Sequence, residues 1–264
     1  MPAWTRRITH AKPEYFEDHA VIRIGFPMTV GLVALMACSA SPTPAQAVPE
    51  PSPVPVSWEL TLKHTQPARI QVDPGSGPKT YWYVLYTVTN NTGEDRDFHP
   101  EVERVSEIES ELPAEQAVSM PSKAARVDKH AAIISLHPRI FEAISRRHAK
   151  THPFLVEPVD AIGRLRQGKD YAISSVIVFP ELDPRASSFT IYIGGLSGER
   201  IRKPNPAYNP RLKSSGAGPS VGKGANPRFY YLRKTLAIPY TLPGDVKTRR
   251  LATPALGRRT WVMR

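Results

Sequence analysis

The chain is short of two features, cysteine pairs and long apolar runs. Cys38 is the single cysteine among 264 residues, so no disulfide can form within the chain and the fold must depend on burial of apolar groups. One apolar run covers residues 24–40, and its uniformly apolar part, 28–38, is shorter than the ~20 residues of a membrane-spanning helix. The sequence therefore excludes a disulfide-stapled scaffold and favours an export signal over a membrane anchor.

Motifs of several enzyme classes are also missing. No Gly-x-Ser-x-Gly nucleophile elbow occurs. The stretch 214–227 is not a phosphate-binding loop, because Ala217 and Gly224 stand where a Walker motif needs glycine and serine or threonine. The acidic residues lack the Asp-x-Asn-x-Asp-Gly loop and distal glutamate of a calcium site. We therefore predict no catalytic residue and no cofactor.

Proline and glycine are abundant, with 28 and 16 residues, and helical patterns are few. This composition predicts short strands separated by turns, hence a mainly β protein. Since the apolar residues thin out at both ends, we expect one domain over residues 57–246. A leader at 1–47 and a proline-rich spacer at 48–56 would precede it, and a basic tail at 247–264 would follow.

The leader has the segment order of a secretory signal, with Arg23 before the apolar run and SPTPAQA after it. Ala45-Gln46-Ala47 offers the small-x-small pattern of ordinary signal peptidase, which would release a soluble periplasmic or secreted protein beginning at Val48. Leu35-Met36-Ala37-Cys38 instead resembles a bacterial lipobox, in which Cys38 would carry a lipid and tether the chain to a membrane. Both alternatives predict export.

Strand patterns begin after the spacer. Residues 57–64 alternate apolar and polar side chains, and 79–90 is aromatic and β-branched on both faces, as expected of a central strand. After a turn at Gly168-Lys169, strands are predicted over 171–179 and 189–193, adjacent and antiparallel to each other. A last strand is predicted over 229–238.

Three segments depart from this strand pattern. Residues 92–118 contain nine acids and two arginines, which predicts an edge strand protected by charge. A short strand at 131–136 precedes Pro138, after which apolar spacing predicts the one helix, over 139–150. Three Asn-Pro dipeptides and a Ser/Gly run predict a long flexible, disordered loop over 203–227.

Residues 81–98, YWYVLYTVTNNTGEDRDF, resemble a strand of the immunoglobulin-like domains of exported bacterial proteins, most of them of unknown function. The stretch from Gly168 through Val178-Phe179-Pro180 to FTIYIGGL is similar to the later half of such domains. The resemblance implies an immunoglobulin-like antiparallel sandwich, here with one short inserted helix, a disordered loop and a basic C-terminal tail. It covers about 65 residues and implies no particular function.

Two histidines have a spacing that could bind metal. His148 and His152 are four residues apart, as on zinc-binding helices, but no glutamate follows the first of them. A weak structural site that adds His137 is one alternative, and ordinary surface histidines are the other. A metal- or ligand-binding accessory protein centred on this helix is therefore our second hypothesis for the function.

The basic C-terminal third supports our first hypothesis for the function, which is the binding of a partner or an anionic polymer. Between residues 200 and 264 there are fifteen Lys and Arg and a single acid, Asp245. The cations nearest to aromatic residues are our candidates for binding a polyanion. They are Arg228, Arg233, Lys234, Lys247, Arg249, Arg250, Arg258 and Arg259.

An exported protein meets anionic envelope polymers rather than nucleic acid, which we do not expect as a partner. The first hypothesis is thus a non-catalytic exported envelope module that contacts a protein partner or an anionic surface polymer. Contact with a membrane is expected only if Cys38 is lipidated. The sequence leaves open whether the acidic segment and the basic tail pair with each other.

Overall fold

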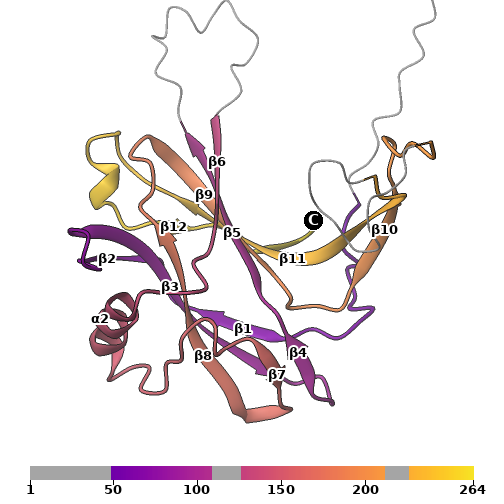
Figure 1. Cartoon of the computed structure of the whole chain (residues 1–264), viewed down its shortest axis with the longest axis horizontal. Helices are drawn as coiled ribbons and strands as arrows, with labels where there is room; N and C mark the ends of the chain where they lie inside the picture. Colours follow the sequence, from indigo (N-terminus) through magenta and orange to yellow (C-terminus); the bar gives the residue numbers. More distant parts are fainter. Residues whose placement is uncertain (1–48, 109–125, 212–225) are drawn as a thin grey trace, which may run out of the picture. The chain divides into compact units, whose positions relative to one another are not determined.

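The computed structural model describes residues 49–108, 126–211 and 226–264 (Figure 1). The leader with Cys38, the acidic residues after Ile108 and the Ser/Gly run lie outside the described residues. The described chain is mainly β and contains the helix α2 (Pro138–His148). The strands are β1 (Thr61–His64), β2 (Ala68–Val72), β3 (Lys79–Asn90), β4 (Arg96–Phe98), β5 (Glu101–Ile108), β6 (Arg126–Ala131), β7 (Gly163–Leu165), β8 (Gly168–Pro180), β9 (Ala186–Gly194), β10 (Arg200–Pro204), β11 (Phe229–Thr241), β12 (Ala255–Leu256) and β13 (Thr260–Met263).

One antiparallel sheet is organised around β3. β1 and β2 pair with successive halves of β3, and β8 pairs with almost its whole length. This confirms that residues 79–90 form a central strand. Gly168, where a turn was predicted, has φ +111° and begins β8.

A second antiparallel sheet has the strand order β10-β11-β9-β5-β6, with β12 and β13 also on β11. β4 and β7 form a separate two-stranded ribbon. Among the described residues, no helix is long and apolar enough to cross a membrane.

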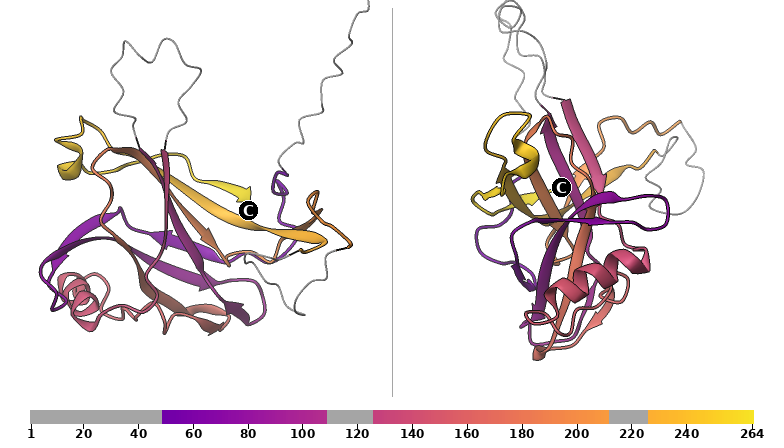
Figure 2. Two further views of the ribbon diagram at one scale, coloured as in Figure 1. Left: turned by 45° about the horizontal axis from the view of Figure 1, so that its top comes forward. Right: turned by 90° about the vertical axis from the view of Figure 1, so that its left-hand side faces the viewer.

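The two larger sheets pack face to face, as in a β-sandwich (Figure 2). Alternate residues of β3 point into the shared core and meet alternate residues of β9 and β11. The core residues of these three strands are Trp82, Val84, Tyr86, Val88, Phe189, Ile191, Ile193, Leu236, Ile238 and Tyr240. Burial of this apolar set stabilises a domain that has no disulfide.

The other face of the first sheet is covered by α2, which explains why β3 is apolar on both sides. Tyr83 and Leu85 of β3 pack with Ile140 and Ile144 of the helix. Pro138 occupies the first turn, and the His137 side chain accepts a hydrogen bond from the Arg139 N–H at 3.3 Å. The predicted helix over 139–150 is confirmed and ends slightly earlier.

Three strand predictions were wrong. β8 and β9 do not pair, because β8 joins β3 whereas β9 joins β5 and β11, so the turn at 181–185 crosses between sheets. β5 is not an edge strand but lies between β9 and β6. The short strand expected at 131–136 is β6, over 126–131. The first two errors concern pairing between distant segments, which periodicity does not encode, and the third concerns the bounds of a strand.

The ends of the domain also differ from the expected boundaries. The tail after residue 246 is partly a strand, since Thr260–Met263 pair with β11 from Lys234 to Ala237. Residues 49–53 and Pro55, assigned to a spacer, line a pocket jointly with β13 and so contact the domain. Contacts with the domain thus reach both ends of the described chain.

Candidate functional site

The Asn-Pro segment expected to be loop is partly ordered around its asparagines. Residues 203 and 204 belong to β10. Asn205 is buried and donates from Nδ2 to the Pro227 carbonyl at 2.7 Å, while the Asn209 N–H donates to Asn226 Oδ1 at 2.9 Å. These bonds join 205–211 to the segment before β11. The described part of the predicted loop 203–227 therefore continues a hairpin, and residues 212–225 lie outside the description.

We call β10, the start of β11 (residues 229–233) and the Asn-linked residues the cationic hairpin. Residues 200–233 contain eight Lys and Arg and no acid. Five of these cations have no carboxylate within ion-pair distance among the described residues. They are Arg200, Arg202, Lys203, Arg211 and Arg228.

Aromatic rings alternate with these cations. Arg202 is the cross-strand neighbour of Tyr231, and Lys203 is that of Tyr230. The two tyrosines are 63 % and 47 % exposed and, as consecutive strand residues, face opposite sides. The guanidinium groups of Arg202 and Arg228 lie over the Phe229 ring at 4.5 and 5.4 Å. Both faces of the hairpin therefore present cations beside exposed rings.

The structure divides the predicted polyanion-binding residues into separate groups. Arg228 belongs to the cationic hairpin, whereas Lys247, Arg249 and Arg250 follow the other end of β11. Thirteen strand residues span about 40 Å, so these groups do not form one site. Arg258 and Arg259 are exposed between β12 and β13.

Arg233, which belongs to the predicted set, and Arg264, which does not, each form an ion pair within the molecule. Arg233 Nη1 lies 2.6 Å from Glu101 Oε1, and Arg264 Nη2 lies 2.6 Å from Glu103 Oε2. The Arg264 guanidinium also lies 3.8 Å from the centre of the Tyr192 ring. The acidic β5 and the basic C-terminal strands thus pair within one chain, and Arg233 is not a free cation.

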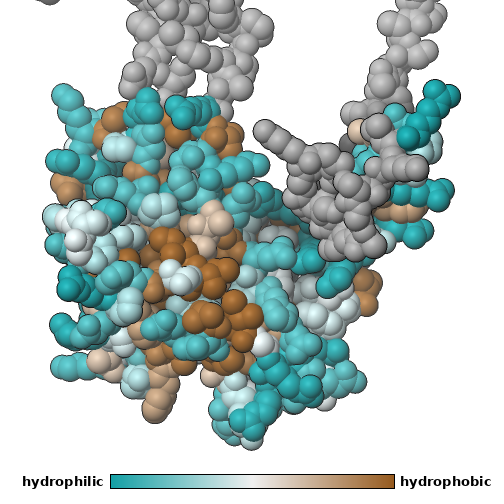
Figure 3. Space-filling model, viewed as in Figure 1, coloured by the Kyte–Doolittle hydropathy of each residue, from teal (hydrophilic) through white to brown (hydrophobic). Residues whose placement is uncertain are grey.

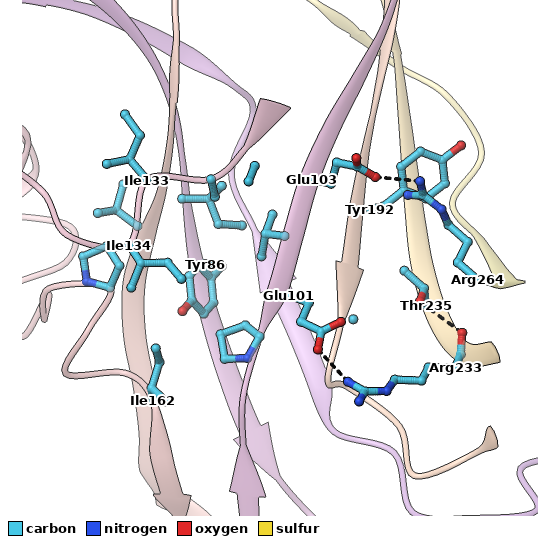
Figure 4. Close-up of a pocket in the computed structure, with 18 residues that line it drawn as sticks. Tyr86, Glu101, Glu103, Ile133, Ile134, Ile162, Tyr192, Arg233, Thr235 and Arg264 are labelled. Carbon is cyan, nitrogen blue, oxygen red and sulfur yellow. Dashed lines mark hydrogen bonds and ion pairs between the residues drawn. The ribbon is translucent and has the colours of Figure 1, made fainter. Parts of the chain in front are cut away.

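These ion pairs border a pocket of about 590 Å³ (Figure 4). Its remaining wall is largely apolar and includes Tyr86, Ile133, Ile134 and Ile162. Ile134 is 48 % exposed, and the space-filling view shows apolar surface around the connection between β6 and α2 (Figure 3). Because its charges are paired, this pocket adds little to the positive field of the hairpin.

Lys234 is not a surface cation, contrary to its assignment from the sequence. It is buried, with Nζ 2.7 Å from Glu59 Oε1 and 2.9 Å from Glu199 Oε2. Its Nζ also donates to the Ser52 carbonyl at 3.3 Å, and Glu199 Oε1 accepts from the Ser52 N–H at 2.8 Å. Lys234 therefore belongs to a buried charge cluster with Glu59 and Glu199.

A glycine brings this cluster together. The Gly198 N–H donates to the Trp58 carbonyl at 3.1 Å, and Glu59 forms a β-bridge with Ser197. A Cβ on residue 198 would clash with the Ser57 and Trp58 side chains, so a larger residue would force them to shift. The sequence signal was the acid beside glycine in Gly198-Glu199, but nothing local indicated that Lys234 would face it.

Stability should depend on pH through Glu199. The Ser52 N–H and then Lys234 lower the pKa of Glu199 below its ordinary value of 4.5, although burial opposes them. A carboxylate with a lowered pKa stabilises the fold above its ordinary pKa, and this contribution is lost as the pH falls through the folded pKa. We expect the loss in urea midpoint between pH 7 and pH 3 to be smaller in Glu199→Gln than in wild type. Equal losses would contradict this role.

Of the histidines that could bind metal, His137 lies apart from His148 and His152. His137 caps the start of α2 and His148 ends it, about 16 Å away for eleven helical residues. His148 Nε2 is 2.9 Å from the Tyr83 hydroxyl, and burial, then His152 and Arg147, lower the pKa of His148. His152 lies beside it with ring centres 6.1 Å apart. Within residues 49–108, 126–211 and 226–264, no three His, Cys, Asp or Glu side chains form a metal-binding group.

Comparisons of the chain with protein-family models, with curated proteins and with solved structures find no match.

Proposed function

We propose that the protein is a non-catalytic, exported binding module of the cell envelope, and that the cationic hairpin binds an anionic surface polymer. The observation that carries this proposal is the cationic hairpin, in which five described cations have no carboxylate within ion-pair distance and Tyr230 and Tyr231 are exposed. Export is inferred from the leader pattern at 1–47. The antiparallel sandwich supports assignment to the immunoglobulin-like class, which the resemblance of residues 81–98 suggests.

The hairpin suits a polymer better than a small ligand. Its cations lie on both faces of a two-stranded ribbon, so their fields add over an extended surface. Figure 1 places β10 and α2 on opposite sides of the domain, so the hairpin is remote from the helix with the histidines. Arginine also binds phosphate, sulfate and carboxylate groups through paired N–H donors.

Removal of three hairpin cations should weaken binding strongly. For an Arg200→Ala/Arg202→Ala/Arg228→Ala variant we expect roughly 10- to 100-fold weaker binding to dextran sulfate near 0.1 M salt, because each arginine is exposed and lacks an acidic partner. The dependence of log affinity on log salt should become shallower by about 2 to 3, as for lost contacts to a dense polyanion. Biolayer interferometry with immobilised dextran sulfate measures both.

The matched control variant removes the same number of positive charges outside the hairpin, from residues that follow β11. Lys247→Ala/Arg250→Ala/Arg259→Ala also removes three exposed cations and should weaken binding less than threefold. Uncharged dextran tests for non-ionic binding. Equal losses in the two triple variants would show that net charge alone, not the hairpin, governs binding.

A further inference from the structure

The proline-rich segment before β1 is held by its backbone. Prolines occupy alternate positions, 49, 51, 53 and 55, which favours an extended polyproline conformation. Ser52, between two prolines, donates its N–H to Glu199 Oε1 at 2.8 Å, and its carbonyl accepts from Lys234 Nζ at 3.3 Å. Both backbone polar groups of one residue are thus taken by one buried ion pair.

The side chains around this contact form a seat for the segment. Residues 49–53, Pro55 and β13 jointly line an open pocket of about 750 Å³ that includes Trp261 and Met263. Trp261 is half-buried, and its ring centre lies 5.4 Å from Lys234 Nζ. Extended proline-rich peptides are commonly recognised by aromatic side chains together with hydrogen bonds to the peptide backbone. Pro51 and Ser52 are half-buried at this contact, whereas residues 53–56 are exposed.

We infer that Glu199, Lys234 and Trp261 form a peptide-binding site for a Pro-x-Pro segment, which residues 49–55 of the same chain occupy. The residue at the clamped position must carry an N–H, because Glu199 accepts from it. Proline therefore fits on both sides of this position but not at it. The site is distinct from the cationic hairpin and does not depend on polymer binding.

Occupation in cis hides the site from added peptide. A segment joined to its own site acts at an effective concentration in the millimolar range, so a free peptide competes poorly. A substitution that weakens the internal segment alone should therefore expose the site. Ser52→Pro does this, since it removes one N–H and keeps the proline-rich character of the segment.

The probe is the labelled nonapeptide VPEPSPVPV, which has the sequence of residues 48–56. Its binding to the full chain is followed by fluorescence anisotropy. We expect Ser52→Pro to bind it at least tenfold more tightly than wild type. Val54→Pro is the matched control, because it adds a proline to the same segment at an exposed residue, and it should bind as wild type does. Tightening in Val54→Pro equal to that in Ser52→Pro would overturn the clamp.

Further arms make each outcome informative. The peptide VPEPPPVPV, which lacks the clamped N–H, should not bind Ser52→Pro, and Ser52→Pro/Glu199→Ala should not bind VPEPSPVPV. A circular-dichroism melt checks folding, and if Ser52→Pro does not fold, a chain from which residues 49–55 are deleted opens the same site. Failure of the opened chain to bind VPEPSPVPV refutes the inference, as does binding that survives Glu199→Ala.

Discussion

Lys234→Met is expected to lower the free energy of unfolding by about 3–5 kcal/mol at pH 7. Methionine retains the volume of the lysine stem, so the main loss is the ammonium between Glu59 and Glu199. Glu199 is 5 % exposed and would remain as a buried carboxylate beside a second one. A buried charge that has lost its partner costs far more than an exposed ion pair contributes. Urea denaturation at pH 7 measures the difference.

The pH dependence separates charge from packing in that variant. Protonation removes the uncompensated carboxylate charge, so the deficit of Lys234→Met relative to wild type should shrink at pH 3. Lys129→Met is the control, because Lys129 is an exposed strand residue, and it should change stability by less than about 0.5 kcal/mol. A deficit of equal size at both pH values would assign the loss to packing.

Substitution of Arg104 is expected to behave in the opposite way, because the loss of side-chain volume should lower stability more than the loss of charge does. It points from β5 into the core, is 2 % exposed and has no carboxylate within ion-pair distance among the described residues. Its Nη1 donates to the Pro180 carbonyl at 2.8 Å, and its guanidinium lies 5.3 Å from the Phe179 ring centre. Burial lowers the pKa of Arg104 to about 10, against the opposing effect of Asp128.

The lowering of the Arg104 pKa from 12.5 to about 10 corresponds to a cost of about 3 kcal/mol for burying the charge. Replacement of Arg104 by an apolar residue removes that cost. Leaving the Pro180 carbonyl without its donor costs a similar amount, about 1–3 kcal/mol. We therefore expect Arg104→Met to unfold within about 1 kcal/mol of wild type. Arg104→Ala should lose about 3–4 kcal/mol, because it also leaves a cavity between the sheets. Equal losses in the two variants, measured by urea denaturation, would mean that the guanidinium bonds dominate.

Lys234 and Arg228 show why the binding residues were only partly predictable. Lys234 and Arg228 occur in one basic stretch, and no local pattern distinguishes them. The structure buries Lys234 because residue 234 of β11 faces the core and meets Glu199. Arg228 precedes the strand and stays exposed. Arg200, Arg202 and Lys203 were not candidates from the sequence, although the absence of acids from 200 to 233 was a signal that could have indicated them.

By itself the sequence determined the mainly β class, the central strand at 79–90, the helix after Pro138 and the dependence on burial without a disulfide. These features follow from periodicity, turn residues and the cysteine count, which act over a few neighbouring positions. Only the tertiary structure decided that β8 and β9 lie in different sheets, that β5 lies inside a sheet, and that Ser52 meets Glu199 and Lys234. The physical reason is that strand pairing and buried charges depend on which distant segments exclude water together, and local residue patterns do not specify those partners.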